Sequence, residues 1–359
     1  MRKLFITGFP GFIGTRLLRE LFRKDAKLEV VALVQQKFLR GAEAARARLS
    51  EEYPMVSTRL QFALGDITLP NLGLTDTDQL APQITQIFHL AAAYDLAIPR
   101  DKGMLINVEG TQNVVGFAKS CSNLTRLDYV STAYVSGNHK GTFSENDFEC
   151  GQKFKNYYEE TKFLAEKIVR EAKDVPSVIY RPGIVVGDSR TGETAKYDGP
   201  YYVLRTMQSL PNHFPFPKIG KGDVVVNLVP IDFVVDAMAA LSADSEAIGK
   251  TFHLTDPVPL EVTQLQSLFA SALGKTFISY PLTPGMARTA MKIGTVRKIY
   301  KMPFQLVDYF VHDVRYESSL TAASLAKHKI SSPNFTEYLP NLIKFFQTHN
   351  EKELQGILI

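Results

Sequence analysis

The chain has 359 residues, of which 45% are hydrophobic and 22% charged, and its formal net charge is +4. This composition is that of an ordinary globular protein, and the charge is too small to indicate a nucleic-acid partner. No apolar run approaches the roughly 18 residues that a membrane span needs, so we expect a cytoplasmic protein without a transmembrane segment. Its two cysteines and scattered histidines show no metal-ligand spacing, so we expect free thiols and no metal site.

The first fourteen residues contain the pattern around which the chain is organised. An apolar run over residues 3–6 is followed by three glycines, three residues apart, and then by an amphipathic helical pattern. Glycines let a backbone approach a pyrophosphate, and the N-terminus of the helix attracts that anion. A purely structural turn is the alternative. We predict a dinucleotide-binding turn in which the cofactor contacts are Gly8, Gly11, Phe12, Ile13 and Gly14.

Short β-rich runs alternate with helical patterns through the first half of the chain, with strands expected at 3–6, 29–34, 59–63, 86–90 and 127–130. This order predicts an α/β protein with a Rossmann-type, doubly wound parallel sheet. We expect an NAD(P)-binding domain over 1–182, to which a strand and a helix return at about 224–254. Residues 183–359 would form mainly a smaller, mostly helical substrate-binding lobe with a C-terminal helical cap.

Three details of the second half are also predicted from its pattern. Residues 224–229 are expected to form a strand that returns to the sheet, and Asp232 is a candidate N-cap of the helix that follows. Strands at 251–254 and 277–280, around a helix at 263–273, are expected to complete the small lobe.

The residues after the second strand bear on the choice of nucleotide. An acidic residue there would bind the adenosine ribose and repel a 2′-phosphate, whereas this chain has Gln35, Lys37 and Arg40. These residues favour NADP(H), with NAD(H) as the alternative. Solvated loop charges explain Lys37 and Arg40 equally well.

Residues at the ends of the third and fourth strands are further cofactor candidates. Asp66 can accept a hydrogen bond from the adenine amine while Ile67 covers the ring, although Asp66 is equally suited to a turn. Ala91 and Ala92 leave room for a dinucleotide against the backbone. Asn107, in a helix predicted over 102–120, needs hydrogen-bond partners, either in a structural network or in a proton relay.

The chemistry is predicted from a hydroxyl and a tyrosine–lysine pair. Thr132 follows the fifth strand, where side chains point into the ligand crevice of such sheets. Tyr158 and Lys162 are one helical turn apart, so the ammonium would lower the pKa of the phenol and make it a general acid. A chance pair on a surface helix is the alternative. Tyr157 is the competing phenol, but its partner four residues on is Thr161.

Together these motifs resemble those of the extended short-chain dehydrogenase/reductase family: Thr-Gly-x-x-Gly-x-x-Gly at 7–14, a threonine before Gly137, and Tyr-x-x-x-Lys at 158–162. Residues 65–74, 87–92, 107–111, 130–135 and 181–192 resemble its male-sterility and thioester-reductase branch. That branch includes fatty acyl-CoA reductases and the reductase domains of carboxylic acid reductases and peptide synthetases.

The resemblance implies a role for each matching residue. Tyr158 would donate the proton, Lys162 would tune it and bind the nicotinamide ribose, and Thr132 would polarise the carbonyl. Asn107 would organise a relay, and Pro182 would lie against the nicotinamide. Many NADPH-using members have Arg where this chain has Gln35, so the NADP preference would depend on Lys37, Arg40 or Arg48.

We therefore expect an NAD(P)H-dependent oxidoreductase that reduces a carbonyl or an acyl thioester to an aldehyde or alcohol. The substrate would be a small molecule or an acyl group carried on CoA or an acyl carrier. A secondary-alcohol or sterol-like dehydrogenase needs the same side chains. A non-catalytic NADP-sensing regulator is a third hypothesis, against which Tyr158 and Lys162 argue. The sequence does not indicate an oligomeric state.

One segment lies outside these motifs. Residues 262–307 contain no Asp or Glu, and an acid-free basic segment attracts anions. We hypothesise contact with the phosphates of CoA or of a phosphopantetheine carrier, or with an anionic membrane surface. Solvated charges are the alternative. The basic residues of the segment are Lys275, Arg288, Lys292, Arg297, Lys298 and Lys301.

Overall fold

The computed structural model describes residues 2–300, 304–351 and 354. Its centre is a seven-stranded sheet with the order β12-β7-β5-β4-β1-β2-β3, in which all neighbouring strands are parallel. The five strands predicted in the first half are all present. The strands are β1 (Lys3–Thr7), β2 (Glu29–Val34), β3 (Leu60–Leu64), β4 (Gln86–His89), β5 (Arg126–Val130), β7 (Ser177–Pro182) and β12 (Thr251–Leu254).

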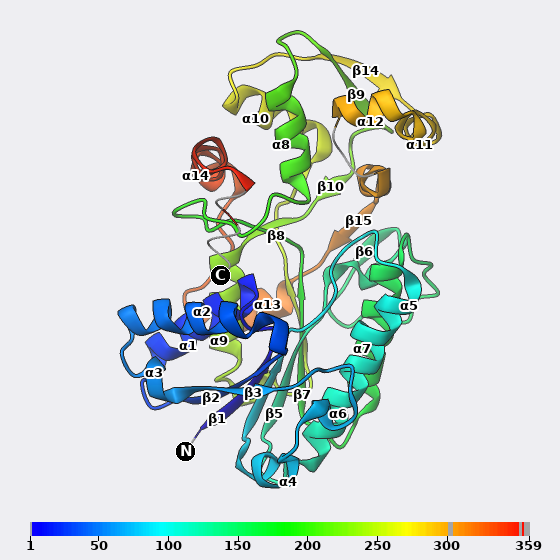
Figure 1. Cartoon of the computed structure of the whole chain (residues 1–359). Coiled ribbons are helices and arrows are strands. Elements are labelled where there is room, and N and C mark those ends of the chain that lie inside the picture. The colour runs from blue at the N-terminus through cyan, green and yellow to red at the C-terminus, as the bar shows by residue number, and fades with distance from the viewer. Residues whose placement is uncertain (1, 301–303, 352–353, 355–359) are drawn as a thin grey trace.

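Helices cover both faces of this sheet (Figure 1). One face packs against α1 (Phe12–Lys24), α2 (Leu39–Glu52) and α9 (Ile231–Leu241), and the other against α6 (Gly110–Ser120) and α7 (Tyr157–Glu171). Alternate residues of each strand face the two helical layers, so most strand residues are apolar, as is usual in buried parallel strands. The doubly wound Rossmann architecture is confirmed. The strand order reverses between β1 and β4, and the carboxyl ends of strands beside such a point flank the ligand crevice.

A second lobe lies beyond the carboxyl ends of the strands, at the top of Figure 1. Its apolar core includes Phe216, Phe269 and Phe346 and is separate from the two layers that flank the sheet. A boundary at residue 182 stays a prediction. The lobe contains α8 (Pro200–Ser209), α10 (Val262–Ala272), α11 (Pro284–Lys292), α12 (Gly294–Tyr300), α14 (Phe335–Thr348) and the parallel pair β9 (Pro215–Ile219) and β14 (Ile278–Leu282).

Two strand assignments made from the sequence are wrong. Residues 224–229 do not return to the main sheet, because β10 (Val225–Val226) pairs with β13 (Leu260–Glu261) and β11 (Leu228–Pro230) pairs with β8 (Ile184–Val186). The strand that returns is β12, which pairs with β7 and so belongs to the main sheet rather than to the small lobe. Short apolar runs of this length carry no information about which strand they will pair with.

Asp232 is not the N-cap of α9, because that position is occupied by Pro230. The Asp232 carboxylate lies in the first turn, where it accepts hydrogen bonds from the backbone N–H of Ser189 at 2.8 Å and from its hydroxyl at 2.5 Å. Its role is structural, as predicted, but it ties a loop to the helix instead of closing the helix end.

The C-terminal region divides between the two lobes. The helix α13 (Ser319–Ala326) packs against α9 and β12, whereas α14 packs in the second lobe, so only part of the predicted helical cap covers the substrate side. The strand β15 (Val314–Tyr316) pairs with β6 (Gly141–Phe143). The remaining helices are α3 (Val56–Arg59), α4 (Thr77–Leu80), α5 (Arg100–Gly103), the π-helical turn η4 (Met104–Glu109) and the 3-10 turns η1 (Gln36–Phe38), η2 (Pro70–Gly73), η3 (Ala81–Gln83), η5 (Ala133–Ser136), η6 (Ser245–Ala247) and η7 (Phe304–Val311).

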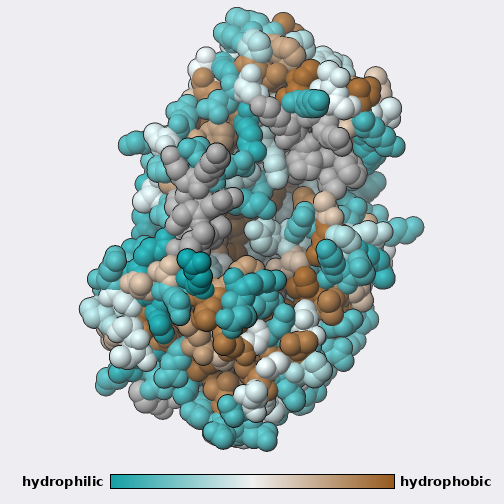
Figure 2. Space-filling view, in the orientation of Figure 1, coloured by the Kyte–Doolittle hydropathy of each residue, from teal (hydrophilic) through white to brown (hydrophobic). Residues whose placement is uncertain are grey.

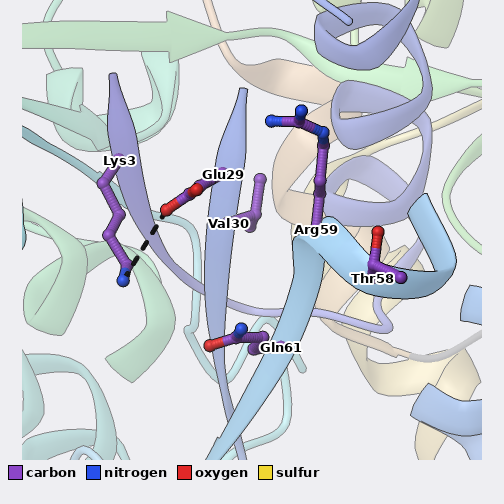
Figure 3. A pocket seen from close by; sticks show the side chains of 6 residues that line it. All are labelled: Lys3, Glu29, Val30, Thr58, Arg59 and Gln61. Atoms are coloured by element: carbon purple, nitrogen blue, oxygen red, sulfur yellow. Dashed lines mark ion pairs between the residues drawn. The ribbon is translucent and has the colours of Figure 1, made fainter. Parts of the chain in front are cut away.

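A hollow of about 240 Å³ opens at the amino end of the sheet (Figure 3). It lies at the amino-terminal ends of β1, β2 and β3, where Nζ of Lys3 is 3.8 Å from Oε2 of Glu29. Ligands of doubly wound sheets bind at the opposite, carboxyl edge. We therefore assign this hollow no part in the chemistry. It is lined by Lys3, Glu29, Val30, Thr58, Arg59 and Gln61.

None of the helices in the described ranges has the length and hydropathy needed to cross a bilayer. In the same ranges, no group of three or more His, Cys, Asp or Glu side chains is arranged to hold a metal ion. Cys121 is buried, Cys150 is exposed, and both thiols are free.

Candidate active site

The glycine-rich turn connects β1 to α1 at the switch point of the sheet. Gly8 has φ +89°, and a Cβ there would lie 2.8 Å from the backbone nitrogen of Ala91. A Cβ at Gly11 or Gly14 would lie 2.7 Å from the carbonyl oxygen of Gly8. The three glycines are therefore required for the turn to pack on itself and on the residues that follow β4.

The start of α1 fits an anionic group. Gly11 is its N-cap, no side chain caps the helix, and its first turn contains no acidic residue. The N–H groups of Phe12 and Ile13, in that turn, precede the first hydrogen bonds within the helix, and such groups attract phosphate. The predicted cofactor residues Gly8, Gly11, Phe12, Ile13 and Gly14 thus form a cradle that suits a pyrophosphate, although their contacts with one stay a prediction.

The residues predicted to bind adenine have partners in the protein itself. The Oδ1 atom of Asp66 accepts hydrogen bonds from the backbone N–H and the hydroxyl of Thr68, both at 2.9 Å, which is the turn role that the sequence left open. Ile67 is buried, and a Cβ on Gly110 would lie 2.8 Å from its Cδ1 atom. Ile67 therefore packs against α6, and its predicted contact with adenine is untested.

Residues at the ends of β2 and β4 line the same edge of the sheet. Gln35 is half-buried, and Lys37 is exposed with its ammonium 5.0 Å from the centre of the Phe38 ring. Ala91 and Ala92 follow β4 after one intervening residue and are half-buried, and the Ala91 N–H donates to the Thr7 hydroxyl at 3.1 Å.

The structure brings Thr132 and Tyr158 together at the carboxyl end of β5. Thr132 lies two residues beyond that strand, after Ser131; its hydroxyl is near enough to the Tyr158 phenol to influence the pKa of that phenol, and it accepts the Tyr134 N–H at 3.3 Å. Burial raises the pKa of Tyr158 to about 12, with Thr132 opposing the rise and Glu159 adding to it. Tyr158 is therefore a neutral phenol at physiological pH, which is the form that can donate a proton.

Lys162 does not lower the pKa of Tyr158 in this structure, so that part of the sequence prediction needs correction. The Lys162 ammonium donates to the hydroxyl of Tyr129 at 2.9 Å and to the carbonyl oxygen of Val130 at 2.8 Å. Burial lowers the pKa of Lys162 to about 7, against the attraction of Glu166. Burial is the largest influence on the pKa of both Tyr158 and Lys162, and the Lys162 side chain is directed toward the carboxyl end of β5.

Asn107 lies in the π-helical turn η4, and both the oxygen and the nitrogen of its side-chain amide are hydrogen-bonded. Its Oδ1 accepts the Ala93 N–H at 2.8 Å, and its Nδ2 donates to the Ala93 carbonyl and to the Thr161 hydroxyl, both at 3.0 Å. Asn107 thus joins the loop after β4 to α7, which is the structural network that the sequence analysis offered. A part in a proton relay stays a prediction.

Sequence reasoning missed the ionic support beneath Thr132. Glu166 accepts a hydrogen bond from the Ser131 hydroxyl at 2.6 Å and pairs with Arg181 at 2.7 Å, and both charged side chains are fully buried. Burial opposes ionisation of Glu166, but Arg181 and Arg170 outweigh it and lower its pKa to about 2. The signal in the sequence was an arginine in an otherwise apolar strand. Pro182, the next residue, is buried at the carboxyl end of β7.

Comparison with known proteins agrees with this geometry. The family model described as male sterility protein matches residues 6–238. The chain is 28% identical over 290 residues to the nonribosomal peptide synthetase asaC of Aspergillus flavus, covering 74% of this chain and 27% of that protein. It is 27% identical over 294 residues to the fatty acyl-CoA reductase wat of Drosophila melanogaster, covering 71% of this chain and 56% of that protein. The chain therefore spans only part of the length of these curated relatives.

Among solved structures, the terminal R domain from the myxalamid PKS-NRPS biosynthetic pathway matches with a TM-score of 0.80 and 25% identity, over 96% of this chain and 90% of that chain. The match covers both lobes described above. The chain belongs to the male sterility protein family, in the thioester-reductase branch of the extended short-chain dehydrogenase/reductases, which are NAD(P)-dependent oxidoreductases.

Proposed function

We propose that this protein reduces an acyl thioester to an aldehyde, or onward to an alcohol, with a reduced nicotinamide cofactor. The observation that supports this most directly is that the hydroxyls of Thr132 and Tyr158 lie near each other at the carboxyl edge of the sheet, where the glycine-rich turn also lies. Two hydroxyls at that edge can bind one carbonyl oxygen. The relatives include a fatty acyl-CoA reductase, which supports a thioester as the substrate.

Each site residue would have a separate role in the proposed reaction. The bound cofactor would supply hydride to the carbonyl carbon. Thr132 would donate a hydrogen bond to the carbonyl oxygen, and Tyr158 would transfer its proton there as negative charge develops. Lys162, with its pKa near 7, would bind the nicotinamide ribose and return a proton to Tyr158. A thioester would give a hemithioacetal, whose collapse to an aldehyde releases the thiol.

The cofactor is proposed to be NADP(H) in preference to NAD(H). The residues after β2 include no carboxylate that would repel a 2′-phosphate, and Lys37 and Arg40 are exposed there. Gln35, Lys37, Asp66, Ala91 and Ala92 lie along one edge of the sheet and would hold the adenosine half. Pro182 would lie against the nicotinamide.

The acyl group is proposed to arrive on CoA or on a phosphopantetheine carrier. The acid-free segment of the second lobe exposes Arg288, Lys292 and Lys298, and Arg288 pairs with Asp308 just beyond the segment. Met286 and Ile293 are also exposed there, at 59% and 55%. Figure 2 shows hydrophobic side chains interspersed with hydrophilic ones over this lobe. A basic surface with apolar residues suits a phosphorylated, partly apolar arm. Lys301 lies outside the described residues.

Reversing two of these charges gives a specific prediction. The double variant Lys292→Glu, Lys298→Glu should raise KM for an acyl-CoA about 3- to 10-fold, since each exposed charge contact contributes up to about 1 kcal/mol. KM for the matching free aldehyde should not change. Lys27→Glu, exposed at the amino edge of the sheet, is the matched control. Equal effects on both substrates, measured by steady-state kinetics, would refute the docking role.

The activity itself is tested with a substrate panel. The protein is incubated with NADPH or NADH and with acyl-CoAs, aldehydes or, with the oxidised cofactors, secondary alcohols and sterols, while nicotinamide absorbance is followed. Consumption of NADPH with acyl-CoA and release of free thiol support the proposal. Turnover of secondary alcohols alone would indicate a dehydrogenase, and cofactor binding without any turnover would indicate a nucleotide sensor.

A further inference from the structure

The segment of residues 307–316 connects the second lobe to the elements around the candidate active site. It begins in the 3-10 turn η7, where Val307 is buried in the core of the second lobe. Asp308 pairs with Arg288 of α11 in the same lobe. The segment ends in β15, which pairs with β6, and β6 lies between η5 and α7 in the chain. Tyr309, the residue after Asp308, is the point at which this segment contacts both η5 and α7.

The hydroxyl of Tyr309 is hydrogen-bonded to the start of α7. It donates to Oε1 of Glu159 at 2.9 Å and accepts a hydrogen bond from Nδ2 of Asn156 at 3.0 Å. Asn156 is the N-cap of α7, and its Oδ1 accepts the Glu159 N–H at 3.0 Å. The three bonds close a ring that includes the first turn of the helix. Tyr157 and Tyr158 lie between the two bonded residues in the chain, so the ring fixes the backbone from which the Tyr158 side chain projects.

The ring of Tyr309 contacts the residue that is bonded to the Thr132 hydroxyl. Its centre lies 5.1 Å from that of the Tyr134 ring, and the two rings meet edge to face, which is a favourable geometry for aromatic pairs. Tyr134 is buried in η5, and its N–H donates to the Thr132 hydroxyl at 3.3 Å. One side chain of the second lobe thus contacts the neighbours of both candidate catalytic hydroxyls, those of Thr132 and Tyr158.

Lys155 holds the same two elements to each other. Its Nζ atom pairs with the fully buried Glu159 at 2.9 Å and donates to the carbonyl oxygen of Gly137, at the end of η5, at 2.7 Å. It also lies 3.1 Å from Nδ1 of His312 and 5.4 Å from the centre of the Tyr309 ring, within the range of a cation–π contact. The end of η5 and the start of α7 are therefore joined by Lys155, and Tyr309 packs against both.

We propose that Tyr309 is a positioning residue that holds Tyr158 in place relative to Thr132, so that the second lobe completes the arrangement of the candidate active site. The inference rests on the proposed function for the roles of Tyr158 and Thr132. Two hydroxyls can bind one carbonyl oxygen only at the right spacing, and a misplacement of about 1 Å can lower a rate about 100-fold. Tyr309 acts through its partners in α7 and η5 and gives no proton to the substrate.

Tyr309→Phe removes the hydroxyl and keeps the ring against Tyr134. The amide of Asn156 then loses this acceptor and Glu159 loses this donor, whereas Lys155 still pairs with Glu159. We expect kcat to fall about 10- to 100-fold, the range that a displaced catalytic group can cost. The Kd for NADPH should stay close to that of the wild type, because the glycine-rich turn is unchanged. If the variant does not fold, Asn156→Ser removes the same hydrogen bond and keeps a favourable N-cap residue.

A cycle of two substitutions separates positioning from loss of folded protein. Tyr309→Phe is combined with Tyr158→Phe, and kcat with NADPH and an acyl-CoA is measured for the wild type, both single variants and the double variant. Because residues that act through each other are not additive, Tyr309→Phe should lower kcat by less than about 3-fold once Tyr158 is replaced. Loss of folded protein would lower kcat by the same factor in both backgrounds. Equal factors, or an unchanged kcat in Tyr309→Phe alone, would overturn the proposal.

A second measurement needs no substrate and is therefore independent of the proposed function. The Cζ atoms of the fifteen tyrosines are labelled with ¹³C in the ligand-free protein, and the NMR resonance of Tyr158 is assigned with Tyr158→Phe. This resonance should shift in Tyr309→Phe. It should not shift in the matched control Tyr338→Phe, since the hydroxyl of that buried tyrosine donates to the carbonyl of Leu228 at 3.4 Å, away from α7. An unchanged resonance in Tyr309→Phe would overturn the proposal, whereas absence of reductase activity would refute the proposed function alone.

Discussion

Replacing Tyr158 with Phe is expected to lower kcat by about 10²- to 10⁴-fold, the usual contribution of a positioned proton donor. The phenol is neutral, with a pKa of about 12, and lies near Thr132, so its removal takes away both the proton and one of the two proposed donors to the carbonyl oxygen. Steady-state kinetics with NADPH and an acyl-CoA measure the loss. Fluorescence titration should give a Kd for NADPH close to that of the wild type.

Tyr157→Phe is a matched control in the same turn of α7. Tyr157 is 47% exposed, so it lies outside the site and should keep full activity. Equal losses in both variants would indicate a general disturbance of the helix, and retained activity in Tyr158→Phe would exclude it as the proton donor.

The sheet and the glycine-rich turn could be predicted because their signals are local. Apolar runs of four to six residues alternate with helical patterns, and the spacing of Gly8, Gly11 and Gly14 reflects close backbone approaches that the structure contains. The pairing of the short strands β8 to β14 could not be predicted in the same way. It depends on contacts between residues far apart in the chain, which no local pattern records.

The sequence suggests which residues could form the site, but it does not predict the electrostatics of Tyr158 and Lys162. A spacing of four places Tyr158 and Lys162 on one side of a helix, yet it does not say which acceptors a lysine will find. In the folded protein Lys162 donates to Tyr129 and Val130, both on β5. Polar residues in buried strands, such as His89 and Tyr129, were the available signal: alternation puts them on one face and predicts that they need partners.

Replacing Arg181 with Met is expected to destabilise the protein by about 3–5 kcal/mol, the usual consequence of removing one partner of a buried ion pair. Arg181 is fully buried, pairs with Glu166 at 2.7 Å and donates to the carbonyl of Asp147 at 2.9 Å. The variant keeps Arg170 as the remaining cation beside Glu166. Urea unfolding at pH 7 measures the loss. Arg190→Met, whose side chain is 72% exposed, is the control and should cost less than about 1 kcal/mol.

The pH dependence of this loss separates the ion pair from packing. The pKa of Glu166 is lowered from its ordinary value of 4.5 to about 2, so the stability that the pair contributes is present above pH 4.5 and declines as pH falls toward 2. Without Arg181 the pKa of Glu166 should rise, and the difference in unfolding free energy between wild type and variant should narrow below pH 4.5. A difference that stays constant down to the lowest pH at which both proteins fold would mean that lost packing against Phe143 and Phe148, and not the charge of Arg181, accounts for the effect.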